Sequence, residues 1–335
     1  MIPTSPSFAI ITLVFSLLCW GTWANTQKAA GKWRFELYYV DFAIGTVLFA
    51  LLGAFSLGSM GDGFTFEDNM AITGKRQMAL AAGSGAIFNL GNMLLAGSTS
   101  LAGMAVAFPL AIGMAMIVSV CWNMVANPAG SIGLQAGGLV VVFAAVVMTA
   151  LAHRMRTLET ATGKKKDSGV KATLLGVFGG VFLGLYAPAL AQSRAGDIGL
   201  SPYGALVFFS VGIALSTLLY SLYFMNLPVQ GEAVPLKHYW KKPHRPHAWG
   251  LAGGMLWSMG ALALFTAGGA PREASAGPAL TLALQYGSAV VAALCGLLVW
   301  KEFGAASGSA RGRMFLAVAL FLGGLLLTAF GLQMA

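Results

Sequence analysis

Charged side chains are scarce in this sequence. Asp, Glu, Lys and Arg together make up 9% of its 335 residues, whereas a typical soluble domain has about 25%. This scarcity excludes a soluble globular enzyme, a disordered chain and a nucleic-acid-binding domain. Cysteine is also rare, and because the three cysteines all lie inside apolar runs, we expect no disulfide framework.

Apolar residues are correspondingly abundant. They make up 57% of the chain, and the mean hydropathy is +0.76. Glycine is abundant, as it is in transmembrane helices. Ten apolar runs are long enough to cross a hydrocarbon core of about 30 Å. The sequence therefore predicts an all-α integral membrane protein with ten transmembrane helices. The runs lie near residues 8–25, 36–57, 77–97, 102–125, 132–152, 172–192, 203–227, 248–267, 276–300 and 313–334.

The basic residues alternate between the two sides of these runs. Sixteen of the 20 Lys and Arg residues fall in segments that follow odd-numbered runs. Because Lys and Arg concentrate in cytoplasmic loops, we expect both termini outside and the segments 153–171 and 228–247 in the cytoplasm. We interpret the net charge of +9 as a topology signal and expect no nucleic-acid partner. No basic leader precedes the first run, so we expect no signal peptide and a multi-pass protein of the inner (cytoplasmic) membrane.

The segment 153–171 divides the runs into two sets of five. We expect a first five-helix repeat at 1–152, a cytoplasmic linker at 153–171 and a second five-helix repeat at 172–335. Because five is an odd number, two similar halves would insert with opposite orientations.

Short similarities between the halves support two inverted repeats. Residues 21–24, GTWA, resemble residues 184–187, GLYA, and Asn89 aligns with Ser258. The similarities occur in the same order and at similar offsets in both halves. The alternative is that Gly- and Ala-rich helices resemble one another without being repeats.

Asp41 is the one carboxylate that lies clearly within an apolar run. A carboxylate there is either paired or protonated by desolvation, so it can exchange protons. Asp41 is therefore our candidate for proton coupling. The alternative is a structural role, as an interfacial anchor near Arg34 or in a hydrogen bond to Tyr38 or Tyr39. Glu36 lies nearer the boundary, and we expect it to be solvated.

Amide side chains within the runs are candidates for substrate binding. Asn89 and Asn92 are three residues apart, so they share a helix face. Each amide offers both donors and acceptors to a hydroxyl-rich or amide-rich solute. Gln285 and Tyr286 occupy the related place in the second half. The alternative is that these side chains hydrogen-bond one helix to another.

Two tryptophans complete the candidate substrate site. Trp20 and Trp257 lie near glycines, and aromatic faces stack well on flat rings or on the apolar face of a sugar. Tryptophan also forms interfacial belts. Trp257 lies too deep in its run for such a belt.

No catalytic or metal-binding motif is present in the sequence. The four histidines, His153, His238, His244 and His247, lie between the apolar runs. For His238, His244 and His247 we expect a solvated basic segment instead of a metal site. No P-loop, G-x-S-x-G or H-E-x-x-H pattern occurs. We therefore expect no catalytic residue, no metal and no cofactor. A membrane-embedded enzyme or a scaffold is the remote alternative.

Several motifs resemble a family of transporters. Residues 19–28, CWGTWANTQK, and 33–42, WRFELYYVDF, resemble the start of ureide permeases and their bacterial relatives. Residues 89–92, NLGN, and 103–106, GMAV, are similar as well. Residues 301–303, KEF, resemble the ending of bacterial rhamnose and glucose/ribose porters. All these families belong to the drug/metabolite transporter superfamily, and the resemblance covers the whole chain in layout.

The resemblance implies an EamA-like bundle of two inverted five-helix repeats around a central cavity. It implies uptake of a small polar solute, such as a sugar, ureide or nucleobase, by proton-driven alternating access. Asp41 matches an aspartate of the ureide-permease-like pattern. The small multidrug resistance branch carries a glutamate in its first span, which residues 8–25 lack, so we do not expect drug/proton exchange by that device.

The expected partners are the solute, protons and membrane lipid, and the expected state is a monomer or homodimer. Export of amino acids or metabolites is the alternative transport function.

Overall fold

The computed structural model describes residues 2–60, 64–160, 167–241 and 244–334, which are helical and contain no strand. The lysines 164–166 and 242, which contribute to the charge alternation, lie outside these ranges. The helices are α1 (Pro6–Thr22), α2 (Ala24–Ala29), α3 (Phe35–Phe55), α4 (Phe66–Ile72), α5 (Lys75–Ala102), α6 (Met104–Ala126), α7 (Ile132–Thr160), α8 (Asp167–Leu185), α9 (Ala187–Ser193), α10 (Pro202–Asn226), α11 (Lys237–Trp240), α12 (His244–Ala267), the 3₁₀ turn η2 (Arg272–Ala274), α13 (Pro278–Leu294), the π turn η3 (Cys295–Val299) and α14 (Gly308–Gln333).

Ten segments in the described part of the chain are long and apolar enough to cross a membrane, and each matches one predicted run. The prediction of an all-α, multi-pass membrane protein is therefore confirmed. Three of the ten segments combine two helical elements each: α1 continues into α2, α8 into α9, and α13 into η3.

The helix ends follow local sequence signals. α1 and α10 both begin with a serine N-cap followed by proline: the Ser5 hydroxyl accepts the Phe8 N–H at 3.3 Å, and Ser201 accepts the Gly204 N–H at 3.2 Å. Such caps pair a backbone donor that the helix itself leaves free. Gly103, with φ of +84°, is the single residue between α5 and α6, a conformation that favours glycine.

The chain forms two compact units, and each takes helices from both predicted repeats. Unit 1 comprises Met1–Leu90 and Tyr186–Ala276, and unit 2 comprises Gly91–Leu185 and Gly277–Ala335. α5 therefore begins in unit 1 and ends in unit 2. The sequence division at 153–171 concerns internal repeats rather than compact units, and it stays a prediction.

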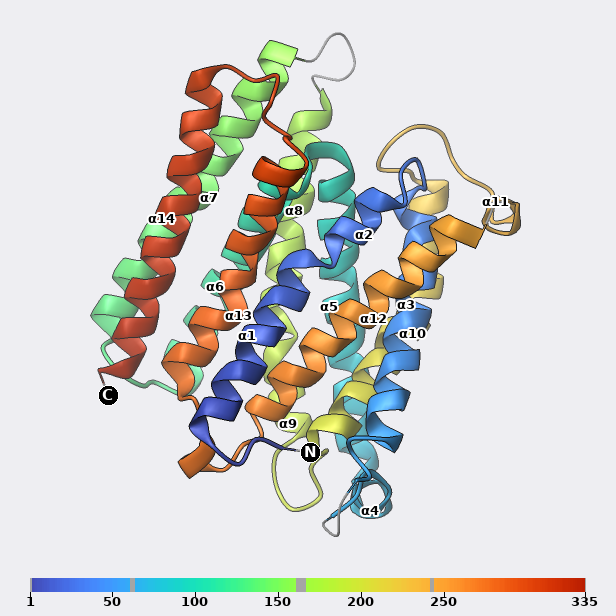
Figure 1. The fold of residues 1–335 in the computed structure, drawn as a ribbon, viewed down its shortest axis with the longest axis vertical. Coiled ribbons are helices and arrows are strands. Elements are labelled where there is room, and N and C mark those ends of the chain that lie inside the picture. The colour runs from blue at the N-terminus through green and yellow to red at the C-terminus, as the bar shows by residue number, and fades with distance from the viewer. Residues whose placement is uncertain (1, 61–63, 161–166, 242–243, 335) are drawn as a thin grey trace. The chain divides into compact units, whose positions relative to one another are not determined.

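In unit 1, α3 packs directly against α12 (Figure 1). A Cβ atom added at Gly254 would overlap the carbonyl oxygen of Phe42, and one added at Gly45 would overlap the carbonyl oxygen of Leu251. Only glycine allows two helix backbones to approach so closely.

α10 packs against the first part of α5 in the same way. A Cβ atom at Gly85 would overlap the carbonyl oxygen of Phe209, and one at Gly212 would overlap that of Ala82. Unit 1 thus contains two close helix crossings, and at each crossing both helices contribute one glycine.

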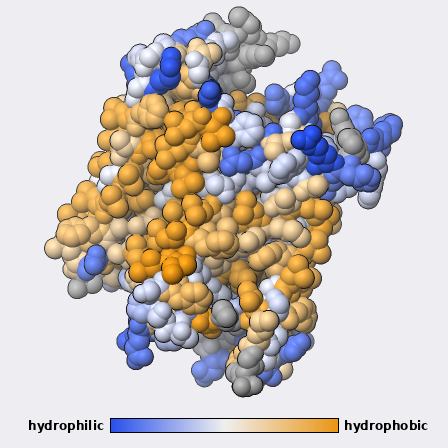
Figure 2. Space-filling view, in the orientation of Figure 1, coloured by the Kyte–Doolittle hydropathy of each residue, from blue (hydrophilic) through white to orange (hydrophobic). Residues whose placement is uncertain are grey.

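In unit 2, α7 and α14 lie side by side (Figure 1). A Cβ atom at Gly138 or Gly324 would lie 2.7 Å from the carbonyl oxygen of the other glycine. Over these two helices the visible surface is predominantly hydrophobic, whereas hydrophilic residues gather over α11 of unit 1 (Figure 2). The apolar surface of α7 and α14 fits contact with lipid.

Candidate functional site

Asp41 is buried near the start of α3, and two other elements of unit 1 supply its partners. The Tyr239 hydroxyl of α11 donates to Asp41 Oδ1 at 2.5 Å, and His247 Nδ1 of α12 lies 3.0 Å from Oδ2. Asp41 itself is 2% exposed. The carboxylate is therefore paired, as a buried carboxylate must be. Sequence reasoning missed both partners.

Aromatic rings surround this pair. The Trp33 ring packs edge-on against His247, with ring centroids 5.0 Å apart, and the rings of Tyr239 and His247 are 4.7 Å apart. A side chain at Gly250 would overlap Cβ of Asp41, so glycine is required for the approach of α12. Burial and the neighbouring Asp41 carboxylate raise the pKa of Tyr239 above its usual range, so its hydroxyl stays a donor.

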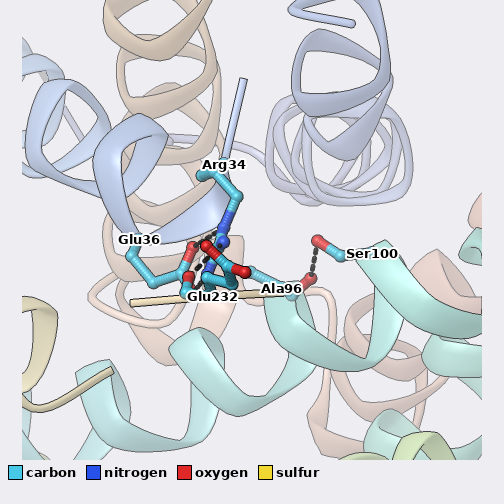
Figure 3. Close-up of polar contacts among 5 residues, drawn as sticks. All are labelled: Arg34, Glu36, Ala96, Ser100 and Glu232. Carbon is cyan, nitrogen blue, oxygen red and sulfur yellow. Dashed lines mark hydrogen bonds and ion pairs between the residues drawn. The ribbon is translucent and has the colours of Figure 1, made fainter. Parts of the chain in front are cut away.

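Glu36 is buried, and the expectation that it would be solvated is wrong. Its carboxylate accepts two hydrogen bonds from the Arg34 guanidinium, at 2.7 and 3.2 Å. Arg34 also donates to the carbonyl oxygen of Glu232 at 3.0 Å (Figure 3). Glu36 can be fully buried because the arginine two residues earlier compensates its charge.

His153 and His247 do not lie between the spanning helices. His247 contacts Asp41, and His153 is 3% exposed, with its Nδ1 accepting from Arg156 at 3.0 Å. α7 and α12 extend beyond the predicted apolar runs into polar sequence, so both histidines lie within helices. The described residues contain no group of three or more side chains that could hold a metal ion.

Trp20 and Trp257 meet in unit 1. Their rings stack with centroids 5.9 Å apart and an interplanar angle of 12°, and Trp20 Nε1 donates to the Trp257 carbonyl at 3.1 Å. Trp257 also stacks on Phe209 and contacts Phe88. Trp257 is therefore buried among aromatic rings, whereas Trp20 is only half-buried.

The Asn89 amide connects α5 to α10. Its Nδ2 lies 3.1 Å from the Ile213 carbonyl, 2.8 Å from Ser216 Oγ and 2.9 Å from Thr217 Oγ1. The nitrogen thus bonds one helix to another, as the alternative interpretation expected. Asn89 Oδ1, however, is buried without a hydrogen-bond partner in the described part of the chain.

Three predicted site residues belong to unit 2. Asn92 is 2% exposed, and Tyr286 is buried with its hydroxyl bonded to Ser119 Oγ. Gln285 is half-buried, and its side-chain amide makes no hydrogen bond to the residues that the structure describes. Gln285 is therefore available to a ligand.

Two spanning segments are broken along their length. α1 gives way to α2 at Trp23, and α8 gives way to α9 at Tyr186. The Tyr186 carbonyl accepts the Ser84 hydroxyl at 2.9 Å, which pairs an acceptor at the second break. Pro188 follows this break, whereas Pro109 lies inside a continuous α6.

A further polar cluster that was not predicted lies in unit 2. The Glu302 carboxylate accepts the N–H groups of Met104 and Ala105, at 3.0 and 2.8 Å, at the start of α6. Arg156 donates to the carbonyls of Ala102 and Glu302, at 2.8 and 3.2 Å. The negative charge faces the positive end of the helix dipole, which stabilises α6 and fixes the loop after η3.

Comparison with known proteins supports the fold and no more than the fold. The chain matches no protein-family model and no curated relative. Several solved structures resemble it, and one of them, a crystal structure, does so with a TM-score of 0.55 and 17% sequence identity over 96% of each chain. At this identity the likeness extends to the arrangement of helices and carries no assignment of activity.

Proposed function

We propose that this protein is a secondary transporter that imports a small polar solute, and that it belongs to the drug/metabolite transporter superfamily. The observation that carries the proposal is that each unit has, within an apolar helix, an amide group with no hydrogen-bond partner among the described residues: the Asn89 oxygen in unit 1 and the Gln285 side chain in unit 2. An unpaired polar group in hydrocarbon costs several kcal/mol. A solute rich in hydroxyl or amide groups would supply the missing hydrogen bonds.

The two inverted repeats of the proposal are supported by the paired helix crossings of unit 1. Gly254 of α12 lies against the Phe42 carbonyl of α3 in the same way as Gly85 of α5 lies against the Phe209 carbonyl of α10. The same sequence interval separates Phe42 from Phe209 as separates Gly45 from Gly212. These contacts are those expected when α3 corresponds to α10 and α5 corresponds to α12.

A side-chain hydrogen bond repeats in the same manner. Ser258 Oγ donates to the Thr46 carbonyl at 3.2 Å, as Asn89 Nδ2 donates to the Ile213 carbonyl at 3.1 Å. Asn89 and Ser258 were aligned from the sequence alone. A duplicated pair of hydrogen bonds is difficult to explain by glycine-rich composition, and it favours a true internal repeat.

The breaks at Trp23 and Tyr186 add a second argument. They fall within the similar segments 21–24 and 184–187 of the two halves. Discontinuous helices at matching places in two repeats are typical of transporter binding sites, because the break frees backbone groups for a ligand. We therefore propose alternating access, with Asp41 as the proton-coupling residue and the inner membrane as the location.

Transport into proteoliposomes tests this function. The purified protein is given tritiated L-rhamnose, D-ribose, allantoin or uracil, with an acidic exterior. We expect accumulation of one of these solutes, and we expect Gln285→Leu to weaken its uptake at least tenfold while Gln192→Leu, at an exposed position, has no effect. Accumulation only in the outward direction would instead support an exporter. No movement of any probe in either direction would contradict the proposal.

A further inference from the structure

We infer that Asp41, His247 and Tyr239 form one proton-binding group, in which His247 carries the proton between Asp41 and water. This inference rests on the proposed function and adds two residues that the sequence did not suggest. The three side chains come from α3, α12 and α11 of unit 1. Their contacts are the two hydrogen-bond distances already given, 2.5 Å from Tyr239 and 3.0 Å from His247.

A gradient of exposure gives the group a direction. The Asp41 side chain is 3% exposed, whereas the His247 side chain is 20% exposed. Water therefore reaches the imidazole and does not reach the carboxylate. A proton that leaves Asp41 has His247 as its accessible route, at the end of unit 1 that the charge alternation predicts to be cytoplasmic.

The groups around Asp41 leave it without competing charge in the described part of the chain. Tyr239 faces it from α11 and His247 from α12, while Tyr38 lies one turn earlier on α3 and bonds to Thr26 instead. Trp33 contributes an aromatic ring. Arg34 and Glu36, which lie just before Asp41 in the sequence, neutralise each other as an ion pair. The state of the group thus depends on the exchange between Asp41 and His247.

The proton transfer balances without another reactant. With Asp41 protonated and His247 neutral, the carboxyl O–H bond breaks as Nδ1 accepts the proton. The resulting imidazolium loses its Nε2 proton to water. The ring ends neutral, with its proton on Nδ1, where it donates to the Asp41 carboxylate across 3.0 Å. Tyr239 donates to Oδ1 and stabilises the negative charge that the transfer leaves.

Uptake and exchange together test the role of His247. Proteoliposomes receive the transported member of the four-solute panel, either with an imposed pH gradient or as counterflow, which requires no net proton movement. We expect Asp41→Asn and His247→Gln to lose gradient-driven accumulation at least about tenfold while both keep counterflow. His244→Gln, an exposed change on the same helix, is the control.

The outcomes separate this inference from the proposed function. If His247→Gln accumulates the solute as the wild type does while Asp41→Asn does not, His247 is no part of the group and the transporter assignment stands. If the wild type moves no solute, the transporter assignment fails.

A measurement without solute checks the group itself. In protein labelled with ¹⁵N-histidine, we expect His247 to carry its proton on Nδ1 in the wild type and to shift toward Nε2 in Asp41→Leu. An identical nitrogen spectrum in the two proteins would overturn the inference. Where Asp41→Leu fails to fold, Tyr239→Phe provides a second perturbation. Removal of the Tyr239 donor is expected to shift the same His247 signals, and unchanged signals would again overturn the inference.

Discussion

Adding one methyl group at Gly254 tests the close packing of α3 against α12. In Gly254→Ala the new Cβ would overlap the Phe42 carbonyl oxygen and lie 2.9 Å from the Thr46 nitrogen. Both neighbours are backbone atoms, so no side-chain rotation relieves the overlap and the helices must move apart. Overpacking of this kind costs about 1–3 kcal/mol. The better helix propensity of alanine returns up to about 1 kcal/mol.

The net loss is expected to be about 1–2 kcal/mol, which thermal unfolding of the purified protein in detergent can measure. The unfolding entropy is about 2.1 cal/mol/K per residue, so for 335 residues 1 kcal/mol corresponds to about 1.4 °C and we expect Tm to fall by about 1–3 °C. Gly83→Ala is the matched control, because nothing lies within 4 Å of its Cβ position. Its Tm is expected to stay the same or to rise slightly.

The equivalent change on α5 tests the proposed repeat. A Cβ at Gly85 meets the Phe209 carbonyl as one at Gly254 meets that of Phe42, so both substitutions should lower Tm by similar amounts. A Gly254→Ala protein as stable as Gly83→Ala would refute the packing argument. A large loss at Gly254 with none at Gly85 would contradict the equivalence of the two crossings.

Three other predictions concern the remaining parts of the chain. Glu302→Gln weakens the two hydrogen bonds at the start of α6 by removing the carboxylate charge, so unfolding should become easier by about 1 kcal/mol, whereas the exposed Glu273→Gln should leave Tm unchanged. Gln285→Ala removes a side-chain amide that bonds to no described residue, so Tm should hold while solute affinity falls; a Tm loss equal to that of Glu302→Gln would argue for a structural role. A cysteine placed at Trp240 should react with an impermeant reagent only from the cytoplasmic side and one at Asp197 only from outside, and the reverse pattern would invert the topology.

The ten helices could be predicted because hydrophobic length is a strong and local signal. Asp41 could be selected as a candidate functional residue because it is a carboxylate within an apolar run. Its partners could not be found this way. Tyr239 and His247 lie about 200 residues further along the chain and look like part of a basic loop, and only tertiary packing brings them to α3. For Glu36 the signal was available: Arg34 lies two residues away, and a pair so close in sequence can bury together.

The candidate solute-binding residues were chosen because they are polar side chains within apolar runs. That criterion does not predict which of them already hydrogen-bond to a neighbouring helix. Asn89 and Gln285 are both amides within apolar runs, yet the nitrogen of Asn89 bonds to α10 while the side chain of Gln285 bonds to no described residue. The break at Trp23 has no proline beside it, so the sequence pattern continues across it, whereas Pro188 in the first turn of α9 marks the break at Tyr186. Such features depend on what the neighbouring helices supply.

The proposed repeat makes the proton-binding group informative, because the group occurs at only one of the two corresponding helix crossings of unit 1. The alignment of the repeats that matches Gly45 with Gly212 also matches Asp41 with Phe208. The alignment that matches Gly85 with Gly254 also matches His247 with Met78. The α3–α12 crossing therefore carries a pair whose attraction depends on a proton, whereas the α5–α10 crossing is apolar at the same two positions. If the proposal holds, protonation of Asp41 acts on the first crossing alone. In a protein built from two repeats, inward-open and outward-open conformations would be nearly equivalent in energy. A single proton that acts at one of the two crossings would then shift the population from one conformation to the other.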